Sequence, residues 1–150
     1  MNPQVKQKWI DALRSGKYEQ GSEKLRGYEG YCCLGVLCDL YAQEKNQEWE
    51  FKGYSEDSEE ESPDIMDYWY FDGESEFLPD SVREWAGMAV KNPQVRVDVS
   101  PEDASANSST YTISSPGDGE DKWFYNDEIA NLNDLGYSFE KLSELIEEQF

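Results

Sequence analysis

Apolar residues recur with a helical period in the first and last thirds of the chain and with shorter, strand-like patterns between them. The first such pattern places four apolar residues on one helix face: Val5, Trp9, Ile10 and Leu13. Asn2 and Pro3 are typical of a helix start, and Gly16 is typical of a helix end. The pattern therefore predicts an amphipathic helix near the amino terminus.

A second helix is predicted from Cys33 to Glu44, because its apolar residues are spaced three and four apart. These residues are Cys33, Leu34, Leu37, Cys38 and Tyr41. A short hairpin is predicted just before this helix, formed by residues 24–26 and 30–32 around a turn at 27–30.

The middle of the chain predicts short strands. Residues 49–51 and the aromatic-rich run 65–71 favour strands, and Asp72-Gly73 predicts a turn after the second of them. A short helix is expected from Leu78-Pro79 to Gly87. Alternating valines then predict a half-exposed strand: Val95, Val97 and Val99.

The last third predicts a hairpin followed by two helices. Residues 111–114 are expected to pair with 122–125 across the turn-forming segment 115–121. The first helix carries Ile129, Leu132 and Leu135 and ends at Gly136. The second begins at Ser138 and buries Phe139, Leu142, Leu145 and Ile146. Together the patterns predict an α+β fold of short, mostly antiparallel strands packed with N-terminal helices and a C-terminal helical hairpin.

The length of 150 residues suits one domain, and no linker divides the chain. We therefore predict a single domain over residues 1–150, with an acidic loop at about 53–63 and a mobile loop at about 100–110. Five tryptophans, ten tyrosines and six phenylalanines supply core area that the modest 37% of hydrophobic residues would otherwise lack.

The formal net charge is −20, and it is unevenly distributed. Residues 1–53 hold eight acidic and eight basic side chains, whereas residues 54–150 hold 25 acidic and five basic ones. Such a field repels nucleic acid and anionic membranes and attracts basic surfaces. Direct binding to DNA or RNA, or to a membrane, is therefore not expected, although residues 127–148 resemble a helix-turn-helix in outline.

The candidate binding surface is the acidic region interleaved with aromatic residues. Its predicted contact residues are Glu56, Asp57, Glu59, Glu60, Glu61, Asp64, Asp67, Asp72, Glu74 and Glu76. Carboxylates held on rigid elements can imitate the phosphates of a nucleic acid and occupy a basic groove. The alternative interpretation is a solubilising face, or adaptation to a saline habitat.

Several chemistries are disfavoured by the residues present. The chain has no histidine, which removes the commonest general base and the usual nitrogen ligand of metals. Cys32, Cys33 and Cys38 lack the paired spacing of a zinc site, so we expect them to lie in the core as reduced thiols. We predict no catalytic residue, no cofactor and no metal; carboxylate-based catalysis is the remaining enzymatic alternative.

No run approaches the roughly 20 apolar residues that span a bilayer, and residues 1–4 do not begin a signal peptide. The expected location is the cytoplasm.

Five segments together resemble a family of small, uncharacterised proteins of bacteriophage and prophage genomes. They are KWIxxLRSGxY at 8–18, YCCLGVLCD at 31–39, LPxxVxxWxG at 78–87, LNDxGxSF at 132–139 and LIEE at 145–148. The resemblance implies a phage accessory protein in the cytoplasm of a bacterial host, where such proteins often blunt host defences. It implies no site residues.

Two function hypotheses follow from these observations. The first is a non-enzymatic phage accessory protein whose acidic surface binds and inhibits a basic host protein, with nucleic-acid mimicry in defence evasion as one form of this activity. The alternative is a protein that binds or sequesters a nucleotide or metabolite. Its pocket would be lined by aromatic residues drawn from Trp9, Tyr31, Trp69, Trp85 and Trp123.

Overall fold

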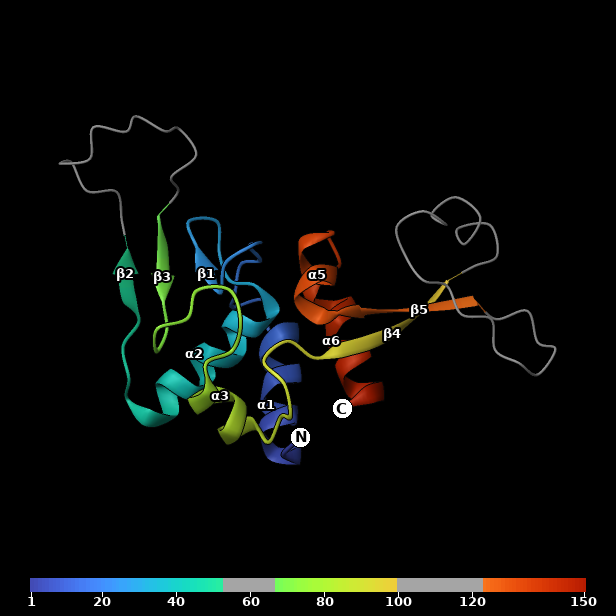
Figure 1. Ribbon diagram of the computed structural model, residues 1–150, viewed down its shortest axis with the longest axis horizontal. Coiled ribbons are helices and arrows are strands. Elements are labelled where there is room, and N and C mark those ends of the chain that lie inside the picture. Colours follow the sequence, from blue (N-terminus) through green and yellow to red (C-terminus); the bar gives the residue numbers. More distant parts are fainter. Residues whose placement is uncertain (53–66, 100–122) are drawn as a thin grey trace.

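The structure is a computed structural model that describes residues 1–52, 67–99 and 123–150. It confirms an α+β fold of helices and short antiparallel strands (Figure 1). In chain order the elements are α1 Pro3–Arg14, β1 Arg26–Gly27, α2 Cys33–Lys45, β2 Glu50–Lys52, β3 Tyr68–Tyr70, α3 Asp80–Ala86, β4 Gln94–Val99, β5 Trp123–Glu128, α5 Ile129–Asp134 and α6 Phe139–Gln149.

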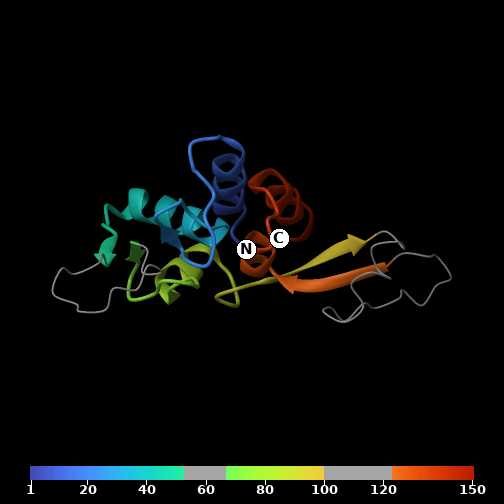
Figure 2. The same cartoon turned by 90° about the horizontal axis from the view of Figure 1, so that it is seen from above.

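The strands form two separate sheets. One has the order β1-β3-β2, with Trp69 of β3 opposite both Arg26 and Phe51. The other is the two-stranded ribbon β4-β5, in register from Gln94 opposite Glu128. Figures 1 and 2 show the sheet and the ribbon at opposite ends of the helical core, with the ribbon extending away from it.

The predicted first and last helices are confirmed, and they pack against each other. The Gln4 amide donates to the Asn2 side chain over 2.9 Å, and the Lys141 amide donates to the Ser138 hydroxyl over 3.2 Å. Both contacts satisfy helix-start N–H groups that have no partner within the helix. Arg14 of α1 joins the pair by bonding both Ser143 and Glu147 of α6.

Helix α2 is the centre of the core. Its residues from Cys33 to Cys38 are buried on every side. A Cβ on Gly35 would lie 1.7 Å from the carbonyl oxygen of Leu25, so only glycine permits this approach of the chain to the helix. The indole of Trp9, fully buried, donates to the carbonyl of Cys33 over 2.9 Å and ties α1 to the start of α2.

Several local predictions are confirmed and one is wrong. The Asp72-Gly73 turn is present, with both residues at positive φ and Phe71 paired with Glu74. Residues 123–125 of the predicted 122–125 strand belong to β5 and pair with β4, a pairing that was not predicted. Helix α5 ends before Leu135, which is 56% exposed and does not belong to the buried stripe.

The predicted acidic loop at 53–63, the mobile loop at 100–110 and the segments 111–114 and 115–121 lie outside the described residues. None of the helices in the described ranges has the length and apolar character that a membrane span requires.

Candidate binding surface

The predicted acidic contact residues divide into two groups. Six of them lie outside the described residues: Glu56, Asp57, Glu59, Glu60, Glu61 and Asp64. The other four, Asp67, Asp72, Glu74 and Glu76, flank β3 and the turn that follows it. Only this second group can be placed in the fold.

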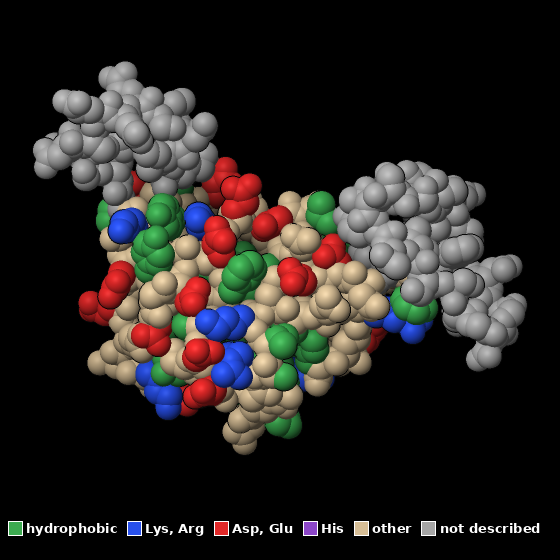
Figure 3. All heavy atoms as spheres, in the orientation of Figure 1, with side chains coloured by type: hydrophobic (Ala, Val, Ile, Leu, Met, Phe, Trp, Pro, Cys, Tyr) green, Lys and Arg blue, Asp and Glu red, His purple; other side chains and the backbone are tan. Residues whose placement is uncertain are grey.

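Asp72, Glu74 and Glu76 each contact a polar group of the chain. Asp72 accepts a hydrogen bond from the Ser81 hydroxyl over 2.5 Å. Lys91 pairs with Glu74, and Lys24 pairs with Glu76, each over 3.1 Å. On the face drawn in Figure 3, lysine and arginine side chains accordingly lie among the acidic ones. The surface is a mixed array with an acidic excess rather than an unbroken sheet of carboxylates.

The predicted pocket aromatics do not share one environment. Trp69 of β3 lies under the guanidinium of Arg26, with 4.4 Å between Cζ and the ring centre. Trp85 of α3 packs edge-on against Tyr41, with 5.4 Å between the ring centres. Trp123 belongs to β5, but its side chain lies outside what the structure describes.

Arg26 also occupies the space between the other aromatic rings near the sheet. Its guanidinium lies 5.3 Å from the ring centre of Tyr31 and 5.7 Å from that of Trp49. Arg26 thus makes cation–π contacts with three of the aromatic rings near the sheet. Trp9, another of the predicted pocket aromatics, is buried in the core.

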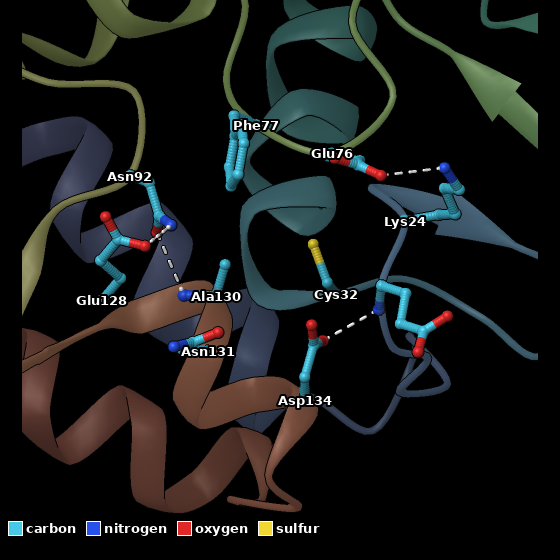
Figure 4. A pocket seen from close by; sticks show the side chains of 10 residues that line it. Lys24, Cys32, Glu76, Phe77, Asn92, Glu128, Ala130, Asn131 and Asp134 are labelled. Atoms are coloured by element: carbon cyan, nitrogen blue, oxygen red, sulfur yellow. Dashed lines mark hydrogen bonds and ion pairs between the residues drawn. The ribbon is translucent and has the colours of Figure 1, made fainter. Parts of the chain in front are cut away.

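A hollow of about 300 Å³ lies where four segments of the chain meet, and we call it the acidic cavity (Figure 4). Its lining residues are Glu23, Lys24, Cys32, Glu76, Phe77, Asn92, Glu128, Ala130, Asn131 and Asp134. Four carboxylates therefore face a single lysine, which is itself paired with Glu76. The cavity carries a formal excess of three negative charges.

Three of these carboxylates are held by bonds to the chain. Asp134 accepts from the backbone N–H of Glu23 over 2.9 Å, and Glu128 accepts from the Asn92 side chain over 3.0 Å. Figure 4 shows the labelled side chains around the cavity, with Glu128 at the left, Asp134 at the bottom, Glu76 at the upper right and Phe77 at the top. Each bond engages one carboxylate oxygen and leaves the second available to a ligand.

A second hollow, of about 690 Å³, adjoins the acidic cavity, because both are lined by Glu23 and Lys24. Its lining also includes Asp67, Glu29 and the 73% exposed ring of Tyr28. The predicted acidic residues Asp67 and Glu76 thus lie in two neighbouring hollows, separated by the loop that carries residues 23 and 24.

The cysteines are part of the core, as predicted. All three are buried and unpaired, and burial raises the pKa of the Cys32 thiol to about 12. The same cause raises the pKa of the Cys33 and Cys38 thiols well above the usual value. Thiols held in this protonated form are poor nucleophiles. Within the described ranges, no three acidic or cysteine side chains gather in a way that would hold a metal ion.

Sequence reasoning missed most of the acidic cavity. Glu23, Asn92 and the pair Glu128 and Asp134 come from three separate segments, none of which is distinctive alone. Asp134 does belong to the LNDxGxSF segment, but nothing in that segment indicates that its carboxylate bonds the amide of residue 23. Only the packing of α5 against the 20–24 loop brings these groups together.

A family model described as Domain of unknown function (DUF8296) matches residues 1–150, so the chain belongs to this family. No curated protein and no solved structure matches the chain.

Proposed function

We propose that this member of the DUF8296 family is a non-enzymatic binding protein whose acidic cavity and surrounding carboxylates engage a basic partner protein. The observation that carries the proposal is the cavity: four carboxylates from three segments surround one hollow, and among the described residues its single lining cation, Lys24, is already paired. A lysine or arginine side chain of a partner would restore charge balance there.

The charge balance of the described residues supports this proposal. They contain 22 acidic and 12 basic side chains. Between the described residues, ion pairs engage seven of those 12 cations: Lys8, Arg14, Lys24, Arg83, Lys91, Arg96 and Lys141. The acidic side chains exceed the basic ones by ten, and the resulting field attracts a cationic surface at long range.

The shape and lining of the cavity suit one basic side chain. The cavity volume of about 300 Å³ is at the lower end of the range for ligand pockets. It can hold one side chain of a partner protein but not a larger part of the partner's surface. Phe77, 40% exposed, offers a ring face to a guanidinium, while Glu128 and Asp134 offer oriented acceptors. An arginine fits this combination better than a lysine because its planar fork can contact ring and carboxylate together.

The sequence resemblance adds an expectation about the partner. A phage accessory protein acts in the cytoplasm of a bacterium, so the basic partner would be a host protein, and a nucleic-acid-binding one has the required surface. Inhibition by occupation of its basic groove follows if the protein mimics nucleic acid.

The alternative, a small-ligand binder, is favoured by the volume of the cavity, about 300 Å³. The lining restricts the ligand class: a nucleotide would place its phosphates against four carboxylates, whereas an amine or guanidine would not. If free arginine amide binds as tightly as an arginine-rich peptide, this result would favour a small-ligand binder over a protein that binds a protein partner.

The test is the affinity of a fluorescent nona-arginine peptide, measured by anisotropy at increasing salt. In the double variant Glu128→Gln with Asp134→Asn, both side chains keep the acceptor that bonds the chain but lose their charge. We expect affinity to fall about 25-fold, because each partly enclosed contact is worth roughly 1 kcal/mol.

The matched control is Glu48→Gln with Glu50→Gln, which removes the same charge from exposed positions around the start of β2. The affinity of this control for the nona-arginine peptide should fall only about twofold, because it weakens the overall negative field of the protein without changing the cavity. Equal losses in the two double variants would mean that the cavity is not the site, and the proposal would then be wrong.

A further inference from the structure

Lys24 lies between the two neighbouring hollows and has a different partner on each side. Its ammonium nitrogen lies 3.1 Å from Oε1 of Glu76, which lines the acidic cavity. The same nitrogen lies 4.8 Å from the ring centre of Tyr68, which lines the second hollow. Figure 4 shows the pair of Lys24 and Glu76 at the edge of the acidic cavity. One side chain thus contributes to the lining of both hollows.

Hydrogen bonds of the backbone bring Lys24 and Glu76 together. The Leu25 amide donates to the Ser75 carbonyl over 2.7 Å, so this bond joins the residue after Lys24 to the residue before Glu76. The Lys24 amide itself donates to the Ser22 carbonyl over 2.8 Å. The backbone is therefore held at this point, and any movement of the ammonium comes from the flexible four-carbon side chain.

The surroundings of the Lys24 ammonium are of the kind that the acidic cavity offers to a partner's cation. The ammonium meets one carboxylate and one aromatic ring, and the cavity offers further carboxylates and the ring of Phe77. The Lys24 side chain is 32% exposed, against 59% for that of Lys8, which forms an ordinary surface pair with Glu44. Lys24 therefore occupies, from within the chain, one of the carboxylates that a partner's side chain would otherwise contact.

From this arrangement we infer that Lys24 is the specificity-determining residue of the acidic cavity: it competes with the partner's side chain for Glu76 and thereby selects arginine over lysine. The inference rests on the proposed function, because it concerns the side chain that the cavity binds. A partner's lysine offers Glu76 the same ammonium that Lys24 already supplies, so the exchange gains nothing there. An arginine offers two N–H groups in a planar fork that can contact both carboxylate oxygens.

The ring of Tyr68 gives the displaced ammonium a place to remain. When an arginine binds Glu76, Lys24 keeps its cation–π contact with Tyr68 and moves toward the second hollow, whose lining also includes Glu29. The displaced cation is then not left directly beside the incoming one, where the two charges would repel each other. Binding thus removes one partner of Lys24 and leaves the other.

The test measures the affinity of fluorescent nona-arginine and nona-lysine peptides for the full-length protein by anisotropy. Lys24→Met removes the competing ammonium but keeps an unbranched side chain, whereas Lys24→Arg keeps the charge and gives Glu76 a guanidinium. The matched controls are Lys8→Met and Lys8→Arg, since Lys8 also pairs with one glutamate but does not line the acidic cavity. Circular dichroism and urea unfolding verify that each variant is folded.

We expect wild type to bind nona-arginine about tenfold more tightly than nona-lysine. Lys24→Met should bind nona-lysine about tenfold and nona-arginine about threefold more tightly than wild type does, so that the preference falls to about threefold. Lys24→Arg should bind nona-arginine about fivefold more weakly at unchanged net charge, because the partner's guanidinium no longer has an advantage over the internal group. Both Lys8 variants should stay within about twofold of wild type and keep its preference.

These results separate competition from a general effect of charge. A general effect would change the affinity of both peptides by one factor in Lys24→Met and would leave Lys24→Arg like wild type, and either result would overturn the inference. If Glu128→Gln with Asp134→Asn weakens binding as expected while the Lys24 variants keep the wild-type preference, the proposed function stands and this inference alone is wrong. If that double variant loses no more affinity than Glu48→Gln with Glu50→Gln, or if neither peptide binds wild type, both are wrong.

Discussion

Asn133 is the most informative position for a stability test, because its buried amide connects three segments. Its side chain is 3% exposed. Its Nδ2 donates to the Gly21 carbonyl over 2.8 Å, and its Oδ1 accepts from the Gln20 side chain over 2.9 Å and from the Cys33 amide over 3.2 Å. The substitution Asn133→Ala removes these three bonds and a longer one, 3.4 Å, from Nδ2 to Oδ1 of Asp134.

The expected loss in unfolding free energy is about 3–4 kcal/mol. The buried Gly21 carbonyl and Cys33 amide would each lose a partner, which costs about 1–3 kcal/mol apiece, and the more exposed bond to Gln20 adds less. This is a large part of the 5–15 kcal/mol that stabilises a typical domain. The loss should also release the 20–24 loop, which forms one wall of the acidic cavity.

Urea unfolding followed by tryptophan fluorescence and by circular dichroism measures this change. Asn131→Ala is the control: its exposed side chain, two residues away, makes one bond to Asp127, so it should cost about 0.5 kcal/mol. If Asn133→Ala costs less than 1 kcal/mol with an unchanged denaturant slope, the amide does not have the connecting role inferred for it.

Three further predictions concern the core. Gly35→Ala should prevent folding, or lower the free energy of unfolding by well over the few kcal/mol of ordinary overpacking, because the new Cβ would overlap the Leu25 carbonyl. The yield and the circular dichroism spectrum of the variant measure this, and a native-like spectrum and stability would contradict the packing. Arg26→Ala should lower the free energy of unfolding by about 1–2 kcal/mol, because its contacts with Trp69 and the neighbouring rings are lost, and it should change tryptophan fluorescence. An unchanged unfolding midpoint would show that these rings do not need the cation. The buried thiols should make the free energy of unfolding fall above about pH 9. They ionise near pH 9.0 when unfolded, whereas burial raises the pKa of Cys32 in the fold to about 12, so the folded state binds more protons between these two values. Each such thiol should lower the free energy of unfolding by about 1 kcal/mol per pH unit in this range. Thermal unfolding from pH 8 to 10 measures the slope, and a thiol reagent should react with native protein only as fast as it opens.

Long amphipathic patterns and local turn chemistry could be predicted from the sequence. Helix α1 and helix α6 follow from capping residues and one apolar face, and the turn at Asp72-Gly73 follows from residues that accept positive φ. These features depend on neighbours within a few residues. The burial of the cysteines was predictable for the same reason, since they lie in an apolar run.

Long-range pairings could not be predicted in the same way. The pairing of β5 with β4 depends on which strands lie side by side in the fold, and residues 123–125 carry no local pattern that selects the valines of β4. Leu135 continues a helical period in sequence, yet α5 ends before it and leaves its side chain exposed. The acidic cavity depends on Glu23 and Asp134 meeting across 111 residues, which no local signal encodes.

The most direct measurement of the central claim is an amide NMR titration of the whole protein with arginine amide at low salt. If the acidic cavity recognises a guanidinium, the largest shifts should fall on Phe77, Ala130 and Asn131, and they should disappear in the Glu128→Gln, Asp134→Asn protein. Shifts spread evenly over exposed carboxylates, or centred away from these three residues, would contradict it.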